Sequence, residues 1–429
     1  MLKHLSNSAN TRPVTGHDVP LRILLASYRS HPHVGGQGVY VYHLSKALHD
    51  LGHKVDVASG PPYPNLAPGI GLVKLPSLDL FAEDNAFSAI RSKHFSSWSD
   101  LSEWLSHNSG AFGEPYAFGR RLHRFILNNP RRYDVVHDNQ TLARALLKIR
   151  KTVPVVTTLH HPISIDLKLA LQSEKRWWMR ALIRRWHRFV RMQAKVARRL
   201  NPILTVSDAS KQAAMRDFGV PAQSFHIVPN GVDQSVFYPD ANIAREDNMI
   251  VTTASADTPL KGLPVLIRAF AELADAFPKL RLVVIGRLRN GPTKDAIKAA
   301  GLSERIEFRS GIDQSEIADL FRKATIMVSP SLFEGFGMPA AEAMACAAPL
   351  IVSTGGALPE VAGDAGLITP KGDAPALAAA IRTLLQDPAQ RTDLGNAALK
   401  RAQDVFSWPR HAQGAVSLYR QALEAHAHH

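Results

Sequence analysis

Short runs of apolar, β-branched residues alternate along the chain with longer segments in which apolar residues recur at helical spacing. The segment 263–277, LPVLIRAFAELADAF, shows the helical pattern between two apolar runs. This alternation predicts a parallel, doubly wound sheet with crossover helices. The predicted strands are 21–27, 54–59, 134–138, 154–160 and 203–207, followed by 249–255, 280–286, 305–310, 325–331 and 349–354.

The alternation restarts near residue 249, after the turn-rich stretch 229–248. We therefore expect an α/β protein with two Rossmann-like domains whose parallel sheets face a central cleft, where ligands bind at the carboxyl ends of the strands. The predicted divisions are a flexible leader at 1–19, domains at 20–238 and 239–407, and a helix at 408–425. Residues 60–133 show the weakest pattern and are interpreted as strand-poor connections with one or two helices.

Length and composition fit two domains of ordinary size, since the chain has 429 residues, 45% hydrophobic and 21% charged. Its one cysteine, Cys346, lies in an apolar run and is interpreted as a buried, inert thiol. No stretch of about 18 apolar residues predicts a membrane span. The N-terminus lacks the apolar core of a signal peptide, so we expect a cytoplasmic protein.

The net charge of +14 comes mostly from one segment. Residues 168–200 hold eleven Lys or Arg and a single Glu. Read as a helix, 176–200 is amphipathic. Its apolar face carries Trp178, Leu182, Trp186, Phe189, Met192, Val196 and Leu200, and its basic face carries Arg176, Arg180, Arg184, Arg188, Arg191, Lys195 and Arg199.

Three interpretations of this basic segment remain open. Its apolar face can belong to the core while the basic face is solvated. Alternatively, the helix can lie on an anionic membrane surface, at the inner face of a membrane. Nucleic-acid binding is disfavoured, because no finger motif or RNA-binding aromatic platform accompanies the charge.

Two loops have features of phosphate binding. Gly35 and Gly36 belong to a GGQG stretch between the first strand and a helix, where backbone N–H groups can meet an anion. A tight βα turn is the alternative, since the spacing is not that of a dinucleotide fingerprint or a P-loop. In the second half, Lys261 and Gly262 also follow a strand and precede a helix, and this lysine can meet a phosphate as a point charge.

The stretch 333–346, FEGFGMPAAEAMAC, places glutamates on both sides of a Gly-rich bend. Glu334 precedes the bend and Glu342 lies about one turn inside the following helix. Carboxylates only accept hydrogen bonds, so hydroxyl groups of a sugar and of a ribose are natural targets. The backbone N–H groups of Phe336, Gly337 and Met338 are expected to point into the cleft. Favourable helix-dipole contacts are the alternative, which accounts for Glu342 but not for the two glycines.

Together, four motifs resemble family 4 of the retaining glycosyltransferases, which have the GT-B fold. They are GGQG, PNGVD (229–233), LKG (260–262) and EGFGMPAAEAMACAAPLIVSTGGALPEV (334–361). The resemblance covers roughly residues 20–420. It implies transfer of a sugar from a nucleoside diphosphate sugar to an acceptor hydroxyl with retained configuration. The acceptor, bound by the N-terminal domain, can be a lipid, a polysaccharide or a small molecule.

The resemblance also implies roles for individual residues. Glu334 would bind the hydroxyls of the transferred sugar, Glu342 the ribose and Lys261 the diphosphate, while His160 would lie near the anomeric centre. The helix after Trp408 would cross back to the N-terminal domain. The remaining contacts would come from the backbone of Phe336, Gly337 and Met338, from Gly35 and Gly36 at the donor–acceptor junction, and from Arg309, Gly311 and Ile312 near the base.

One departure stands out, because Ser255 and Ala256 occupy the places of a Gly-Arg pair that the family usually has. Our hypothesis is that Arg287 compensates for that arginine. No cluster of metal-ligating residues is evident, so we expect activity without a metal or further cofactor. His137 and Asp138 end a strand and can face the acceptor. The alternatives to a transferase are a nucleotide-sugar epimerase of the same fold and a degenerate sugar-nucleotide-binding protein.

Overall fold

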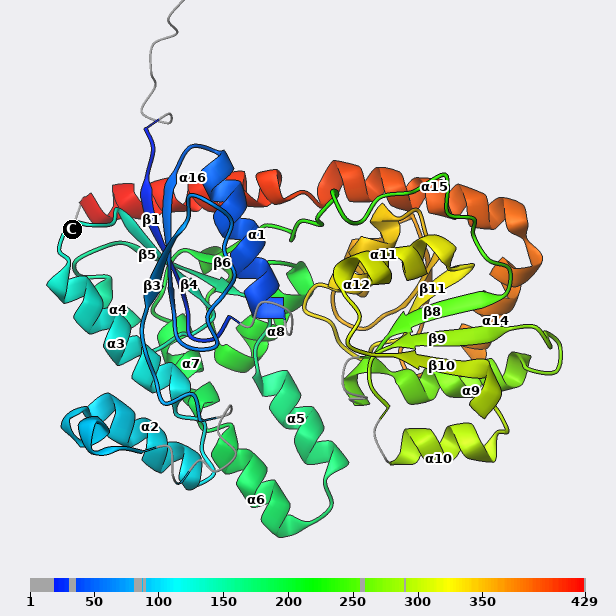
Figure 1. Ribbon diagram of the computed structural model, residues 1–429, viewed down its shortest axis with the longest axis horizontal. Coiled ribbons are helices and arrows are strands. Elements are labelled where there is room, and N and C mark those ends of the chain that lie inside the picture. Colours follow the sequence, from blue (N-terminus) through cyan, green and yellow to red (C-terminus); the bar gives the residue numbers. More distant parts are fainter. Residues whose placement is uncertain are drawn as a thin grey trace, which may run out of the picture.

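The protein is described by a computed structural model that covers residues 19–30, 36–80, 87, 90–254, 259–288 and 291–427. Figure 1 shows two α/β lobes side by side, with the last two helices running along both. Each lobe is built on a parallel sheet, as the alternating pattern predicts. The expected leader falls almost entirely outside the described residues.

The N-terminal domain has seven strands in the order β3-β2-β1-β4-β5-β6-β7. Two of them, β3 and β7, are absent from the predicted strands because they are only four and three residues long and half exposed. The others match the apolar runs to within one or two residues. The strands are β1 (Arg22–Ser27), β2 (Lys54–Ser59), β3 (Gly71–Lys74), β4 (Val135–Asn139), β5 (Val155–Leu159), β6 (Ile203–Thr205) and β7 (Phe225–Ile227).

Helices cover both faces of this sheet, since side chains alternate between the faces of each buried strand. On one face lie α1 (Gly36–Asp50) and α16 (Trp408–Ala427). The other face is covered by α3 (Glu114–Asn128), α4 (Leu146–Ile149), α7 (Phe189–Ala197) and α8 (Asp208–Phe218). The peripheral helices are α2 (Trp98–Asn108), α5 (Ser164–Ser173) and α6 (Trp177–Trp186).

The C-terminal domain has six strands in the order β10-β9-β8-β11-β12-β13. They are β8 (Met249–Thr253), β9 (Arg281–Ile285), β10 (Ile306–Arg309), β11 (Ile326–Ser329), β12 (Leu350–Ser353) and β13 (Leu367–Thr369). Helices α9 (Leu263–Leu273), α10 (Pro292–Ala299) and α14 (Ala374–Gln386) pack on one face. On the other lie α11 (Gln314–Lys323), α12 (Met338–Ala345), α13 (Leu358–Ala362) and α15 (Pro388–Val405).

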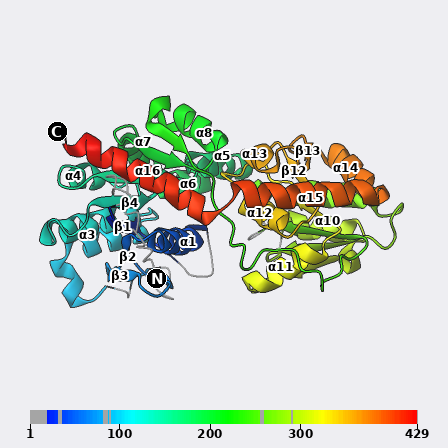
Figure 2. The same cartoon turned by 90° about the horizontal axis from the view of Figure 1, so that it is seen from above.

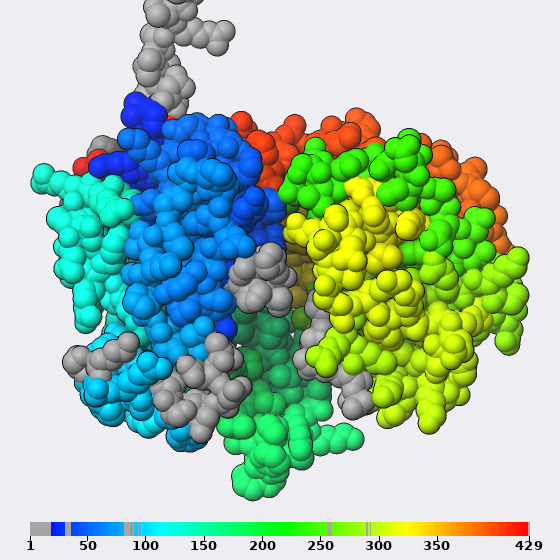
Figure 3. All heavy atoms as spheres, viewed as in Figure 1, coloured from blue at the N-terminus to red at the C-terminus, as the bar shows by residue number. Residues whose placement is uncertain are grey.

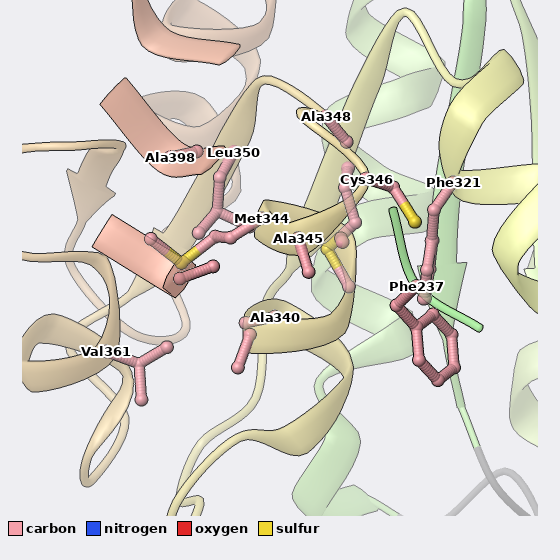
Figure 4. Packing of buried hydrophobic residues seen from close by; sticks show 14 of the residues in the cluster. Phe237, Phe321, Ala340, Met344, Ala345, Cys346, Ala348, Leu350, Val361 and Ala398 are labelled. Carbon is pink, nitrogen blue, oxygen red and sulfur yellow. The ribbon is translucent and has the colours of Figure 1, made fainter. Parts of the chain in front are cut away.

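Helix α12 is held by small side chains that let it pack tightly between its neighbours. Ala340, Ala345 and Cys346 lie among Met344, Leu350 and Ala398 in Figure 4. Burial raises the pKa of the Cys346 thiol to about 12, so this cysteine is an inert core residue. A helix fixed in this way presents its N-terminus at a defined place beside the carboxyl end of β11.

The two domains are joined twice, at neighbouring places. The first connection follows β7, and the second lies between α15 and α16. Val232 of the first connection donates its N–H to the carbonyl of Phe406, 3.1 Å away, and pairs with Ser407 as an isolated parallel bridge. Seen from above in Figure 2, α15 lies over the C-terminal domain and α16 over the N-terminal domain.

The basic segment is not the single helix over 176–200 that its periodicity suggests. It forms α6 and α7, which are separated at His187 and Arg188. The apolar residues of α7 are buried in the domain core, whereas α6 has no buried residue. Packing against the sheet fixes α7, whereas α6, which precedes it in the chain, lies outside the core. The segment thus combines a core helix with an exposed one.

Candidate active site

An ion pair joins two loops at the carboxyl edge of the C-terminal sheet. The Lys261 Nζ lies 2.8 Å from Glu334 Oε1, which also accepts a hydrogen bond of 2.8 Å from the Ser331 hydroxyl. Lys261 ends the 3₁₀ turn after β8, and Glu334 lies in the loop after β11. Both side chains remain partly exposed, so a ligand can reach either partner.

Glycines allow these loops to approach closely. A Cβ added to Gly262 would lie 2.0 Å from the Pro330 carbonyl oxygen, and its φ of +68° favours glycine. Gly356, in the GGALPE stretch at 355–360, has a φ of +66°, and a Cβ there would lie 2.2 Å from the Glu334 carbonyl oxygen. The glycines of both motifs therefore fix the backbone on either side of the ion pair.

The same loop touches the N-terminal domain. A Cβ on Gly335 would come within 2.8 Å of the His160 carbonyl oxygen. The Ser210 Oγ lies 2.6 Å from that oxygen and 3.0 Å from the carbonyl oxygen of Gly335. The Ser207 hydroxyl donates to Gly335 as well, at 2.6 Å. The loop that carries Glu334, the partner of Lys261, thus contacts the backbone of His160 across the domain boundary.

The N-terminus of α12 opens beside this junction. Gly337, with a φ of +102°, precedes the helix. Within the described chain, the backbone N–H groups of Phe336, Gly337 and Met338 have no hydrogen-bond acceptor. The side chains of Phe336 and Met338 belong to the core instead, where the Phe336 ring lies edge-on to Phe406. The three backbone N–H groups thus stay available to a ligand, and their contact with one remains a prediction.

Glu342 follows one turn into α12. Burial raises the pKa of its carboxyl to about 7, and no hydrogen bond within the described chain offsets that burial. A group of this kind gains most from a ligand that supplies hydroxyl donors. Hydrogen bonds from ligand hydroxyls to the Glu342 carboxylate would therefore contribute to the free energy of ligand binding.

His160 is held in a defined orientation. Its Nε2 lies 2.8 Å from the Asn139 Oδ1, and its backbone N–H donates to the Gln140 side chain at 2.6 Å. The Asn139 amide nitrogen donates to the Ser27 hydroxyl, so its oxygen faces the imidazole and Nε2 carries the proton. Burial, with His161 and His411 nearby, lowers the pKa of His160 to about 3. The imidazole is therefore neutral, with Nδ1 as a hydrogen-bond acceptor.

The neighbouring His161 points elsewhere and pairs with Asp166, with 3.0 Å between Nε2 and Oδ2. The expectation that His137 and Asp138 face the acceptor is wrong, because both are fully buried within β4. His137 belongs to a chain of buried hydrogen bonds in the N-terminal domain. That chain runs from the Tyr419 hydroxyl through His137, Thr158, Tyr40 and His411 to the Pro229 carbonyl, with distances of 2.5, 2.6, 2.8, 2.9 and 2.9 Å.

The residues expected near the base follow β10. Arg309 forms an ion pair of 2.5 Å with Glu307, so its guanidinium is already engaged. Gly311 is exposed with a φ of +75°, and Ile312 packs partly into the core. Gly36 begins α1, and a Cβ there would meet no atom within 4 Å. Gly35, Ser255 and Ala256 lie outside the described residues.

The space-filling view shows a hollow between the two domains, above α5 (Figure 3). Lys261 and Glu334 follow strands that end toward this side. Among the described residues, no group of three or more His, Cys, Asp or Glu side chains could hold a metal ion.

Comparisons with known proteins show the family of the chain. The model "Glycosyltransferase Family 4" matches residues 34–236, and "Glycosyl transferases group 1" matches residues 237–401. An MMP alpha-(1->4)-mannosyltransferase of Mycolicibacterium hassiacum is 43% identical over 94% of this chain and 98% of its own. The chain belongs to glycosyltransferase family 4.

Solved structures show that this glycosyltransferase has the GT-B fold. A sucrose-phosphate synthase from Thermosynechococcus elongatus has a TM-score of 0.71 at 24% identity, over 94% of this chain and all of that one. The Anabaena HepE protein in complex with UDP-glucose has a TM-score of 0.63 at 16% identity, over 95% and 100%. The protein is thus a transferase with two facing α/β domains.

Several residues of the glycosyltransferase site have no signal in the sequence that singles them out. Asn139 orients His160, and Ser207 and Ser210 link the domains through Gly335. Glu360 of the GGALPE stretch accepts hydrogen bonds from the N–H groups of Asp208 and Ala209, at 2.7 and 2.8 Å. This carboxylate caps α8 across the domain boundary, a favourable place for an anion. The motif marks Glu360, but only the fold shows its partner.

No helix among the described residues of the glycosyltransferase is long and apolar enough to cross a membrane. The exposed helix α6 carries Trp177, which is 80% exposed, together with the half-exposed Trp178 and Leu182. These side chains belong to the N-terminal domain, whereas the ion pair belongs to the C-terminal domain.

Proposed function

We propose that the protein is a retaining hexosyltransferase that moves a sugar from a nucleoside diphosphate sugar to an acceptor hydroxyl without a metal ion. The observation that carries this proposal is the junction at Gly335. There the loop after β11, whose Glu334 pairs with Lys261, contacts the backbone of His160 from the other domain. A donor sugar at this junction would contact a cation, a carboxylate and the acceptor-binding domain at once.

The chemistry follows from the charges. The departing nucleoside diphosphate gains negative charge, which Lys261 and the N–H groups before α12 can stabilise. Glu334 can accept hydrogen bonds from the sugar hydroxyls and lies where positive charge develops on the ring. In the ligand-free protein the two side chains neutralise each other. A bound donor separates them, so that each meets its own part of the ligand.

Mannose is the proposed sugar. The relative from Mycolicibacterium hassiacum is named for α-(1→4)-mannosyl transfer and matches almost the whole chain. A nucleoside diphosphate α-mannose that gives an α linkage retains its configuration. We infer a saccharide acceptor for the same reason. The named relative does not specify the nucleoside, so we assign the base by experiment.

We propose that Arg287 contributes the second cation of the diphosphate site. It follows β9, and the N–H of Ala254 bonds to the Ile285 carbonyl at 2.9 Å. This bond places the start of the loop that contains Ala256 beside Arg287. The Arg287 side chain has no ion-pair partner in the described chain. An Arg287→Ala variant with unchanged affinity for the donor sugar would refute this role.

The proposed function is tested with UDP-, GDP-, ADP- and TDP-mannose and mannosyl oligosaccharides as acceptors. A ligand at about a hundred times its Kd stabilises a protein by roughly 2.7 kcal/mol, so thermal unfolding identifies the base first. Product linkage is then determined, with and without EDTA. Lys261→Ala and Glu334→Gln should lose turnover, with Lys371→Ala as the control. A β product, or loss of activity with EDTA that added metal restores, would contradict the proposal.

An epimerase and a binding protein remain the alternatives, and the same assay separates them. Conversion of the nucleotide sugar without an acceptor indicates an epimerase. Donor binding without conversion, in the presence of every acceptor, indicates a degenerate binding protein.

We also propose that α6 makes peripheral contact with an anionic membrane surface. Its exposed Trp177 and Trp178 lie beside Arg176 and Arg180, and none of its residues is buried. This combination is typical of interfacial helices. Flotation with anionic and neutral vesicles tests the contact. Wild type should float with anionic vesicles and Trp177→Ser/Trp178→Ser should not; equal behaviour of both proteins would exclude it.

A further inference from the structure

A groove lined by cations runs between α3, α4 and α7, on the outer face of the N-terminal domain. It consists of three hollows of about 390, 190 and 560 Å³ that share Tyr116 and Arg144. No aspartate or glutamate lines any of them. The basic side chains along it are Arg120, Arg124, Arg144, Lys148, Arg185, Arg188, Arg191 and Lys195.

Most of these cations have no counter-charge in the described chain. In that part of the chain, no side-chain hydrogen bond or ion pair is formed by Arg124, Arg144, Lys148, Arg188, Arg191 or Lys195. By contrast, Arg121 of α3 does not line the groove and is paired with both Asp100 and Glu103. Some cations outside the groove are paired as well, for example Arg132 with Asp56. Positive charge that no carboxylate of the lining neutralises is therefore present along a concave surface.

The spacing of the cations suits a row of anions. Arg188, Arg191 and Lys195 lie on successive turns of α7. Arg120 and Arg124 lie one turn apart on α3, across the groove, and Arg144 lies between the two rows. A flat membrane would meet protruding side chains more readily than a hollow. Two rows of cations across a hollow instead surround a ligand from both sides.

We propose that this groove binds a ligand with several phosphate groups. Guanidinium groups bind phosphate oxygens in a bidentate manner, and a phosphate offers more charge and more acceptor oxygens than a single carboxylate, which suits cations that approach from two sides. The Tyr116 hydroxyl would donate a further hydrogen bond. Burial raises its pKa, although Arg144 and Arg188 act in the opposite direction, so it keeps its proton.

The groove is separate from the sugar-nucleotide site, and the proposal does not rest on the function proposed above. Lys261 and Glu334 belong to the other domain. Helices α3 and α7 lead into β4 and β6, so each begins near the carboxyl edge of the sheet and runs away from it. The groove extends along these helices, from Arg188 at that edge toward Arg124 and Lys148.

The first experiment uses sodium tripolyphosphate and calorimetry at low salt, with all proteins carrying Lys261→Ala to remove the sugar-nucleotide site. Arg144→Gln/Arg188→Gln is the groove variant. The matched control is Arg199→Gln/Lys371→Gln, which removes the same charge from exposed positions outside the groove. We expect the groove variant to bind at least tenfold more weakly and the control to stay within twofold. Equal affinities in both variants would overturn the site, provided that thermal unfolding shows both to be folded.

A second arm identifies the source of the phosphate. Vesicles of phosphatidylcholine with and without phosphatidic acid are tested on the same variants, which retain α6. Loss of tripolyphosphate binding alone in the groove variant indicates a soluble phosphorylated ligand, and loss of both indicates a lipid headgroup. If neither probe binds wild type, the proposal is wrong. Tighter binding of single-stranded RNA than of tripolyphosphate would assign the groove to nucleic acid and also overturn it.

Discussion

Replacing Glu342 by glutamine should stabilise the ligand-free protein and weaken its binding of the donor sugar. The carboxyl lies in α12 without a hydrogen-bond partner in the described chain, and burial raises its pKa from 4.5 to about 7. Glutamine has nearly the same shape and is always neutral. The variant therefore removes the cost of burying the charge while leaving the packing of α12 intact.

The sign follows from proton linkage. The pKa of Glu342 is higher in the folded than in the unfolded state, so the folded state binds more protons between pH 4.5 and about 7. Stability is consequently lost as the pH rises through this range, the reverse of a salt-bridged carboxylate. A shift of this size corresponds to about 3 kcal/mol at about 1.4 kcal/mol per unit. Because the residue is partly exposed, solvent screening reduces the expected effect to about 1 to 2 kcal/mol.

Urea unfolding at pH 4.5 and pH 8 measures this effect. The two proteins should be nearly equally stable at pH 4.5, and Glu342→Gln should be more stable at pH 8. Its affinity for the nucleotide sugar should fall by about tenfold or more, since hydrogen bonds to charged groups contribute about 1.5 to 3 kcal/mol. A stability difference that does not change with pH would refute the assignment of a raised pKa. Unchanged affinity would remove Glu342 from the site.

Three further predictions concern neighbouring structure. Asn139→Ala should lower kcat by roughly tenfold or more with little change in KM, because His160 loses its orientation; steady-state kinetics would show an unchanged kcat if the imidazole is held otherwise. Gly262→Ala should destabilise the protein by at least about 1 to 2 kcal/mol, since a left-handed φ and a carbonyl at 2.0 Å both oppose a Cβ; an unaltered Tm would contradict the geometry. His411→Leu should lower stability by about 1 to 3 kcal/mol by leaving the Pro229 carbonyl and the Tyr40 hydroxyl without this partner, and urea denaturation that gives wild-type values would show that the chain of hydrogen bonds contributes little.

The fold was largely predictable because its strands are buried and apolar on both faces. Runs such as 280–286 are too apolar to read as amphipathic helices. The helical pattern of 263–277 separates this run from the run at 249–255. The strands that the pattern did not predict share one cause. Short edge strands such as β3 carry too few apolar residues to produce a pattern, and their position depends on neighbouring strands rather than on their own sequence.

The basic segment shows a different limit. The apolar periodicity over 176–200 is continuous, yet the helix is interrupted at His187, because α7 packs on the sheet while α6 does not. The spacing of apolar residues predicts which of them share one face of a helix. It does not predict how far along that helix the rest of the domain provides a surface for the face to pack on. Tertiary contacts decide that point.

The candidate site was predictable where glycines are constrained by close approach, as at Gly262 and Gly337. Residues that act by positioning another side chain were not predictable. Asn139 is one of many asparagines until β4 places it beside His160, and His137 resembles a site residue until its hydrogen bonds show that it belongs to the interior. Both judgements require distances between residues far apart in the chain.

The helix that crosses back has a consequence for biosynthesis. The N-terminal domain buries Trp408, Ala412, Leu418 and Tyr419 of α16 against its sheet and α1. These residues leave the ribosome only after the entire C-terminal domain has been translated. Until then, one face of the N-terminal sheet lacks α16, one of the two helices that cover it, and its apolar side chains stay exposed to other nascent chains. We therefore expect the C-terminal domain to reach its native state first during synthesis, although it is the later of the two in the sequence.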